Sequence, residues 1–144
     1  MHILKTKYRQ AILFLVLLIV VCVQSCTPRK EPVPAVIAGK GGNAIIVAHP
    51  KHHAKFIDSC TIYLKYNASD LPSGGTDPNQ FDEVVKCVKI NDTPTAVFSG
   101  LTKGNYFLYG SGWDTSIQAK VSGGIPFTIT ADSTTNTVSV FISE

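Results

Sequence analysis

The sequence lacks the short motifs that mark the common catalytic centres. Neither G-x-S-x-G, H-E-x-x-H, G-x-G-x-x-G nor a Walker loop occurs in the 144 residues. The adjacent carboxylates of Asp82 and Glu83 are not opposed across a cleft, as acid–base catalysis would require. We therefore expect a protein that is not an enzyme and that carries no cofactor.

Basic charge is also scarce once the N-terminal segment is set aside. Three of the 13 basic residues, Lys5, Lys7 and Arg9, precede Cys26, whereas all ten acidic residues follow it. The remaining chain is balanced and has no dense cluster of Lys and Arg with interleaved aromatic residues. This excludes nucleic acid as the expected partner.

No apolar run is long enough for an ordinary transmembrane helix. The longest spans residues 11–23 and, as a helix, would reach only about 20 Å across a hydrocarbon core of about 30 Å. A cationic flank, a short apolar stretch and small residues at its exit are typical of a signal peptide. Such a segment can precede a lipid-modified N-terminus, and the alternatives are secretion with ordinary cleavage of the signal peptide and retention of the segment as a membrane anchor.

The apolar run ends at Val23-Gln24-Ser25-Cys26, which resembles a bacterial lipobox, although Gln24 departs from the usual small or branched residue. The resemblance implies a lipoprotein signal peptide over residues 1–25 and a membrane partner reached through a lipidated Cys26. Thr27 follows, where an Asp would favour inner-membrane retention under the best-known sorting rule. We therefore expect the outer membrane of a Gram-negative bacterium.

Residues 26–42 comprise the lipidated cysteine and a flexible tether. Pro28, Pro32 and Pro34 favour extended backbone, and three glycines loosen the end of the segment. A folded domain is then expected over residues 43–144, a length ordinary for one domain.

Residues 60–66 alternate, placing Cys60, Ile62, Leu64 and Tyr66 on one face, as a half-buried strand does. Similar runs occupy residues 43–49, 83–90, 95–98, 105–109, 117–121, 127–130 and 137–143. Turn signals separate them, among them Ser122-Gly123-Gly124. We expect an all-β fold, a single antiparallel β-sandwich of about seven or eight strands.

Residues 98–109 contain Phe98, Gly100, Leu101, Gly104 and Tyr106 in the order F-x-G-L-x-x-G-x-Y. This resembles the signature of prealbumin-like sandwiches, the carboxypeptidase regulatory-like and transthyretin-like domains. Its physical content is an apolar strand residue, a turn with glycine, and an aromatic side chain that returns to the core.

A broader resemblance rests on four segments and points to small bacterial envelope lipoproteins with no assigned biochemical function. The segments are His52-His53, residues 60–67, residues 109–114 and residues 123–126. Together the two resemblances imply a prealbumin-like Greek key and a lipidated Cys26, and they carry over no catalytic residue.

Two cysteines remain for the domain, Cys60 and Cys87. An oxidising compartment favours a disulfide if the two Cα atoms lie within about 7 Å, and two buried free thiols are the alternative. No C-x-x-C spacing indicates redox or metal chemistry.

Three histidines, His49, His52 and His53, crowd one segment and offer imidazole ligands for zinc or copper. Neighbouring side chains in an extended chain point to opposite faces, which opposes a shared site. Structural roles for these histidines are the competing interpretation.

The segment Tyr109-Gly110-Ser111-Gly112-Trp113-Asp114 places aromatic rings between glycines. Tyr109, Trp113 and Asp114 are therefore candidate ligand contacts, and Trp113 would either stack on a sugar or peptide or cover one end of the sandwich.

These observations favour a lipid-anchored, non-enzymatic binding or structural module of the cell envelope, with an envelope protein or glycan as its unidentified partner. The alternatives are a metal-handling lipoprotein that uses His49, His52 and His53, and a carbohydrate-binding accessory domain that uses Trp113.

Overall fold

A computed structural model describes residues 36–144, so the predicted signal peptide and the predicted lipidation site, Cys26, lie outside the described residues. Within this part of the chain the fold is all-β, as predicted, and its one helical element is the short 3-10 turn Pro78–Gln80. No helix among these residues is long and apolar enough to cross a membrane.

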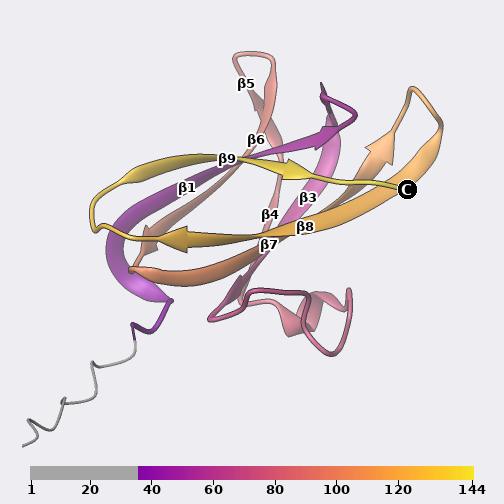
Figure 1. The fold of residues 1–144 in the computed structure, drawn as a ribbon. Helices are drawn as coiled ribbons and strands as arrows, with labels where there is room; N and C mark the ends of the chain where they lie inside the picture. The colour runs from indigo at the N-terminus through magenta and orange to yellow at the C-terminus, as the bar shows by residue number, and fades with distance from the viewer. Residues whose placement is uncertain (1–35) are drawn as a thin grey trace, which may run out of the picture. The chain divides into compact units, whose positions relative to one another are not determined.

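The strands form two sheets (Figure 1). The first sheet contains β1 (Lys40–His52), β2 (Lys55–Phe56), β5 (Val88–Ile90), β6 (Thr93–Leu101) and β9 (Thr135–Phe141). The second runs in the order β4 (Glu83–Lys86), β3 (Ser59–Tyr66), β7 (Gly104–Asp114) and β8 (Ala119–Ile129).

One pairing departs from the antiparallel arrangement that we predicted. β9 runs parallel to β1, with Ile45 opposite Thr135 and Lys51 opposite Phe141, whereas every other paired strand is antiparallel to its neighbour. β9 can lie parallel to β1 because the chain reaches it from β8 in the other sheet, a crossover rather than a hairpin.

Two predicted runs differ in extent. Residues 83–90 form two strands, β4 and β5, because the chain passes at Cys87 from the second sheet to the first. Conversely, residues 119–129 form one strand, and the turn expected at Ser122-Gly123-Gly124 is wrong. A Cβ on Gly123 would lie 2.8 Å from the Phe141 carbonyl oxygen, so this glycine permits a close backbone approach and not a turn.

The core lies between the sheets and takes one face of each strand. β1 contributes Ala44, Ile46 and Ala48, while β3 contributes Ile62 and Leu64, all fully buried. Each large apolar side chain buried in this way contributes about 1.5–3 kcal/mol of hydrophobic free energy. The same alternation continues to the end of β1, where the inward position is occupied by His52.

At the other end of these strands the chain enters the domain beside Tyr106. β1 begins at Lys40, three residues before the run expected from the sequence, and Ala38 is already buried. The Tyr106 hydroxyl donates to the Thr102 carbonyl (2.7 Å) and accepts from the Gly39 amide (3.2 Å). The side chain of Asn67 accepts from the Ala38 amide (2.7 Å) and donates to its carbonyl (3.0 Å). We call this group, Ala38, Gly39, Asn67, Thr102 and Tyr106, the Tyr106 end.

Candidate functional site

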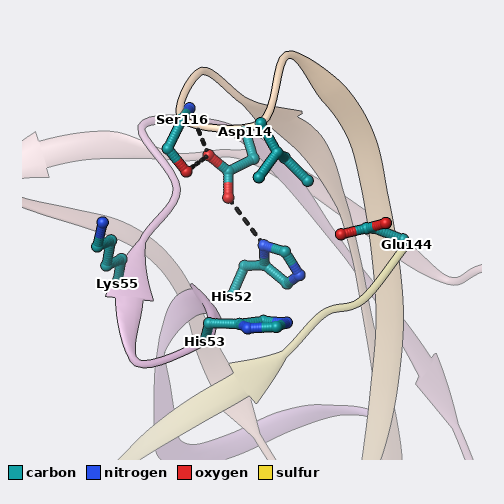
Figure 2. A pocket seen from close by; sticks show the side chains of 7 residues that line it. His52, His53, Lys55, Asp114, Ser116 and Glu144 are labelled. Atoms are coloured by element: carbon teal, nitrogen blue, oxygen red, sulfur yellow. Dashed lines mark hydrogen bonds and ion pairs between the residues drawn. The ribbon is translucent and has the colours of Figure 1, made fainter.

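The opposite end of the sandwich, which we call the His52 end, holds a buried pair of ionisable side chains. It comprises His52, His53, Asp114, Ser116 and Glu144, which lie at the ends of β1, β7 and the C-terminal segment (Figure 2). His52 and Asp114 both occupy inward positions of their strands because the alternation of β1 and β7 puts them on the core side.

The His52 and Asp114 side chains are joined by a short hydrogen bond. Nδ1 of His52 donates to Oδ2 of Asp114 at 2.8 Å, and the two side chains are only 4% and 7% exposed. The other carboxylate oxygen accepts from the Ser116 hydroxyl (2.6 Å) and the Ser116 amide (2.7 Å). The bonds from Ser116 and His52 lower the pKa of Asp114 to about 2, so this carboxylate is ionised at neutral pH.

Nε2 of His52 is buried and has no hydrogen-bond partner among the described residues. Since Nδ1 carries the proton that Asp114 accepts, Nε2 is the ring nitrogen left without a partner. Leaving such a group unpaired costs about 1–3 kcal/mol, and native proteins rarely keep that penalty without a use for the atom. This nitrogen is therefore the atom of the domain most in need of a ligand.

His53 lies against His52 because the chain turns sharply there. His53 and Ala54 have φ of 48° and 68° and form the two-residue turn between β1 and β2, with His52 opposite Lys55. The two imidazole rings come within 4.1 Å, centroid to centroid, at an angle of 62°. The expectation that neighbouring histidines point apart holds for extended backbone and is wrong for this turn.

These side chains line a hollow of about 200 Å³. Figure 2 shows the His53 ring beneath His52 and the Glu144 carboxylate to the right of the His52 ring, with Asp114 above the ring and Lys55 farther off. Because the lining carries two carboxylates and one ammonium group, the hollow has a small excess of negative charge and suits a cation or a hydrogen-bond donor.

A second, smaller hollow of about 110 Å³ shares Asp114 and is lined also by Trp113 and Phe56. Trp113 is 48% exposed, because it occupies an outward position of β7. The structure thus brings together Trp113 and Asp114, two of the three predicted ligand contacts. The third, Tyr109, lies in a separate cluster on the outer face, where its ring stacks on Phe81 at 5.8 Å.

The predicted histidine trio divides into a pair and a single residue. His49 occupies an outward position of β1, and its Nδ1 donates to the Pro94 carbonyl at 3.1 Å. Its ring packs edge-on to Phe56, which is a structural role. In residues 36–144, no group of three His, Cys, Asp or Glu side chains is placed so that it could hold a metal ion.

Cys60 and Cys87 are both buried and free, so the structure does not show the predicted disulfide. They are nevertheless neighbours, because the Cys87 amide donates to the Cys60 carbonyl at 2.9 Å. The Cys60 thiol stabilises a Cys87 thiolate, which lowers the pKa of Cys87 and raises that of Cys60.

Sequence reasoning missed Ser116, Lys55 and Glu144 as parts of the site. The spacing Asp114-Thr115-Ser116 is a usable signal for Ser116, because an Asp side chain commonly accepts from the backbone two residues on. Lys55 and Glu144 carry no such signal, since only the fold places them at the hollow.

Comparison of the chain with protein-family models, curated proteins and solved structures finds no match.

Proposed function

We propose that this protein is a lipid-anchored, non-enzymatic binding module of the bacterial cell envelope, and that it binds its ligand at the His52 end. The observation that carries the proposal is the unpartnered, buried Nε2 of His52, a residue that also lines a hollow. A structural module has no use for such an atom, whereas a binding module completes it with a ligand.

The direction of β1 places the start of the described chain and the proposed binding site at opposite ends of the domain. The described chain enters at the Tyr106 end, where Ala38 is buried, and β1 then runs to His52 at the opposite end. Residues 36–39, the described part of the proposed tether, therefore lie at the end of the domain remote from the hollow. The lipobox-like tetrad and the absence of an Asp after Cys26 support anchoring in the outer membrane.

The environment of Phe98, Gly100, Leu101, Gly104 and Tyr106 supports the proposed prealbumin-like Greek key. Phe98, Leu101 and Tyr106 are fully buried, and both glycines have positive φ, 71° and 143°. A Cβ on Gly104 would lie 2.7 Å from the Ala38 amide nitrogen, so the motif also makes room for the entering chain.

Membrane fractionation tests the anchor. The wild-type chain is expected in the membrane fraction with a mass that shows cleavage before Cys26 and three acyl chains. Cys26→Ser should remain unprocessed or be released. Equal processing of both chains, or a mature mass without lipid, would overturn the lipoprotein proposal.

Trp113, the one tryptophan of the chain, reports on ligand binding because it lines the neighbouring hollow. We expect a saturable change in its emission with the correct ligand class, and the exposed ring makes soluble oligosaccharides the second class to test after metal ions. If neither chitooligosaccharides nor divalent cations change the emission or the imidazole resonances of His52, the binding proposal fails.

A further inference from the structure

We propose that the hollow at the His52 end binds one borderline divalent cation such as Zn²⁺, with Nε2 of His52, an imidazole nitrogen of His53 and the Glu144 carboxylate as its protein ligands. This inference rests on the proposed binding role of the same end. It replaces the trio expected from the sequence, because His49 faces the other side of β1.

His52 is held as a metal-binding histidine usually is. In such sites the ring nitrogen that does not bind the metal donates its proton to a carboxylate or carbonyl group, which fixes the tautomer and the direction of the ring. Asp114 does this for Nδ1 at 2.8 Å, and Ser116 holds Asp114 in place with two hydrogen bonds. The free Nε2 is therefore oriented before any ion arrives.

His53 becomes the second ligand by a movement and a rotation of its side chain. Two imidazoles bound tetrahedrally to one Zn²⁺ have ring centroids about 5 Å apart, given zinc–nitrogen distances near 2.0–2.1 Å. The two rings now pack edge to face with centroids 4.1 Å apart, so the His53 ring must move outward by roughly 1 Å and turn until one of its nitrogens faces the ion. His53 is exposed, whereas His52 is fixed, so the movement falls on the side chain that is free to make it.

Glu144 supplies the third ligand by rotation of an exposed side chain. Its carboxylate lines the same hollow and lies beside the His52 ring, at the right in Figure 2. The ligand set of two imidazoles and a carboxylate suits zinc and not magnesium or calcium, which prefer oxygen ligands only. The fourth position stays open to water or to a side chain of a partner.

The rival occupant of the hollow is an uncharged ligand that donates a hydroxyl group to Nε2. Such a ligand would satisfy His52 alone and would have no need of the second imidazole. The two occupants therefore differ in their dependence on His53, and this difference decides the experiment.

The full-length chain in detergent micelles, stripped of metal with a chelator, is titrated with ZnCl₂ in a calorimeter. We expect one ion per chain, no heat from MgCl₂, and at least a tenfold loss of zinc affinity in His53→Asn. His49→Asn is the matched control because it removes an imidazole four residues away and should bind zinc as the wild type does. Glu144→Gln should weaken binding less than His53→Asn.

Nitrogen-15 spectra of the imidazoles identify the coordinating atom. Zinc should shift Nε2 of His52 and leave the resonances of His49 in place. No zinc binding, or equal affinity in the His49 and His53 variants, would overturn the inference. If zinc fails while an oligosaccharide still shifts Nε2 of His52, the cation is wrong but the binding role stands. Failure of every ligand rejects both.

Discussion

Both ends of the sandwich contain hydrogen-bonded polar side chains, but the two ends use them differently. At the Tyr106 end, the Tyr106 hydroxyl and the Asn67 amide each have donor and acceptor partners in the backbone. At the His52 end, Asp114 is satisfied by His52 and Ser116, but Nε2 of His52 is not. One end is thus complete without a ligand, and the other is not.

The difference separates structure from function within a single domain. Hydrogen bonds at the Tyr106 end fasten the entering chain to the loop after β3 and the turn after β6, so they stabilise the fold. The hydrogen bonds at the His52 end orient a ring whose second nitrogen contributes nothing to the fold. Stability and binding are therefore expected to respond separately to substitutions at the two ends.

The largest expected effect is oxidation of Cys60 and Cys87. The pair lies toward the His52 end, since Cys60 is opposite Gly112 on β7. A disulfide would link segments of the chain at this end covalently, whereas the Tyr106 end is held together by hydrogen bonds. A thiol–disulfide oxidant would remove two protons and two electrons from the pair. Closing the loop should stabilise the domain by about 3 kcal/mol.

The measurement compares melting temperatures of the oxidised and reduced chains, with a rise of roughly 10 °C expected on oxidation. Cys87→Ser is the control, since it cannot form the bridge and should melt alike under both conditions. Two alkylated thiols in protein taken directly from cells would show that the bridge does not form in the cell.

Next in size is the loss of the Tyr106 hydroxyl. Tyr106→Phe leaves the Gly39 amide and the Thr102 carbonyl without their partner and should reduce the free energy of unfolding by about 1–3 kcal/mol. Zinc affinity should not change, because the His52 end is untouched. Denaturant unfolding measures the loss, and Tyr109→Phe is the matched control, since its contribution is the stacked ring that phenylalanine keeps.

The all-β fold and most strand positions could be predicted because alternation is local information. Residues 60–66 follow the pattern, and β3 matches them within one residue. The sequence misleads at a glycine whose role depends on backbone that is distant in the sequence. Ser122-Gly123-Gly124 has the composition of a turn, but Gly123 lies within a strand and admits the backbone that follows β9.

The site was predicted only in part, for a related reason. His52, His53, Trp113 and Asp114 were singled out from the sequence, but their grouping was not. His52 and His53 were expected to point apart, and only the left-handed conformation of the turn brings their rings together. The pairing of His52 with Asp114 joins residues 62 positions apart, which no local pattern reveals.

A smaller effect is expected in acid at the His52 end. The pKa of Asp114 is lowered from 3.8 to about 2 in the folded chain, so its ionised form favours folding. This contribution is complete above the unfolded pKa and disappears as the pH falls from about 4 to 2. The Asp114→Asn variant should lack the part of the acid destabilisation that comes from Asp114. The Ser116→Ala variant should lose an amount of stability between those of the wild type and Asp114→Asn. Thermal melts at pH 5 and pH 2.5 measure it, and parallel losses in all three chains would contradict it.

The smallest expected effect distinguishes the two ends most directly, and it is a gain. The turn His53-Ala54 requires positive φ at both positions, and the turn Asn91-Asp92 between β5 and β6 has the same geometry with better-suited residues. His53→Asn should therefore stabilise the domain by about 0.5 kcal/mol, because asparagine tolerates this conformation with less strain. The same substitution should weaken zinc binding at least tenfold, and a more stable chain that binds worse cannot be explained by unfolding.

The reciprocal change, Asn91→His, should destabilise the domain without changing zinc affinity. If His53→Asn instead destabilises the fold, His53 has a structural role, and the contrast between the two ends fails at this residue.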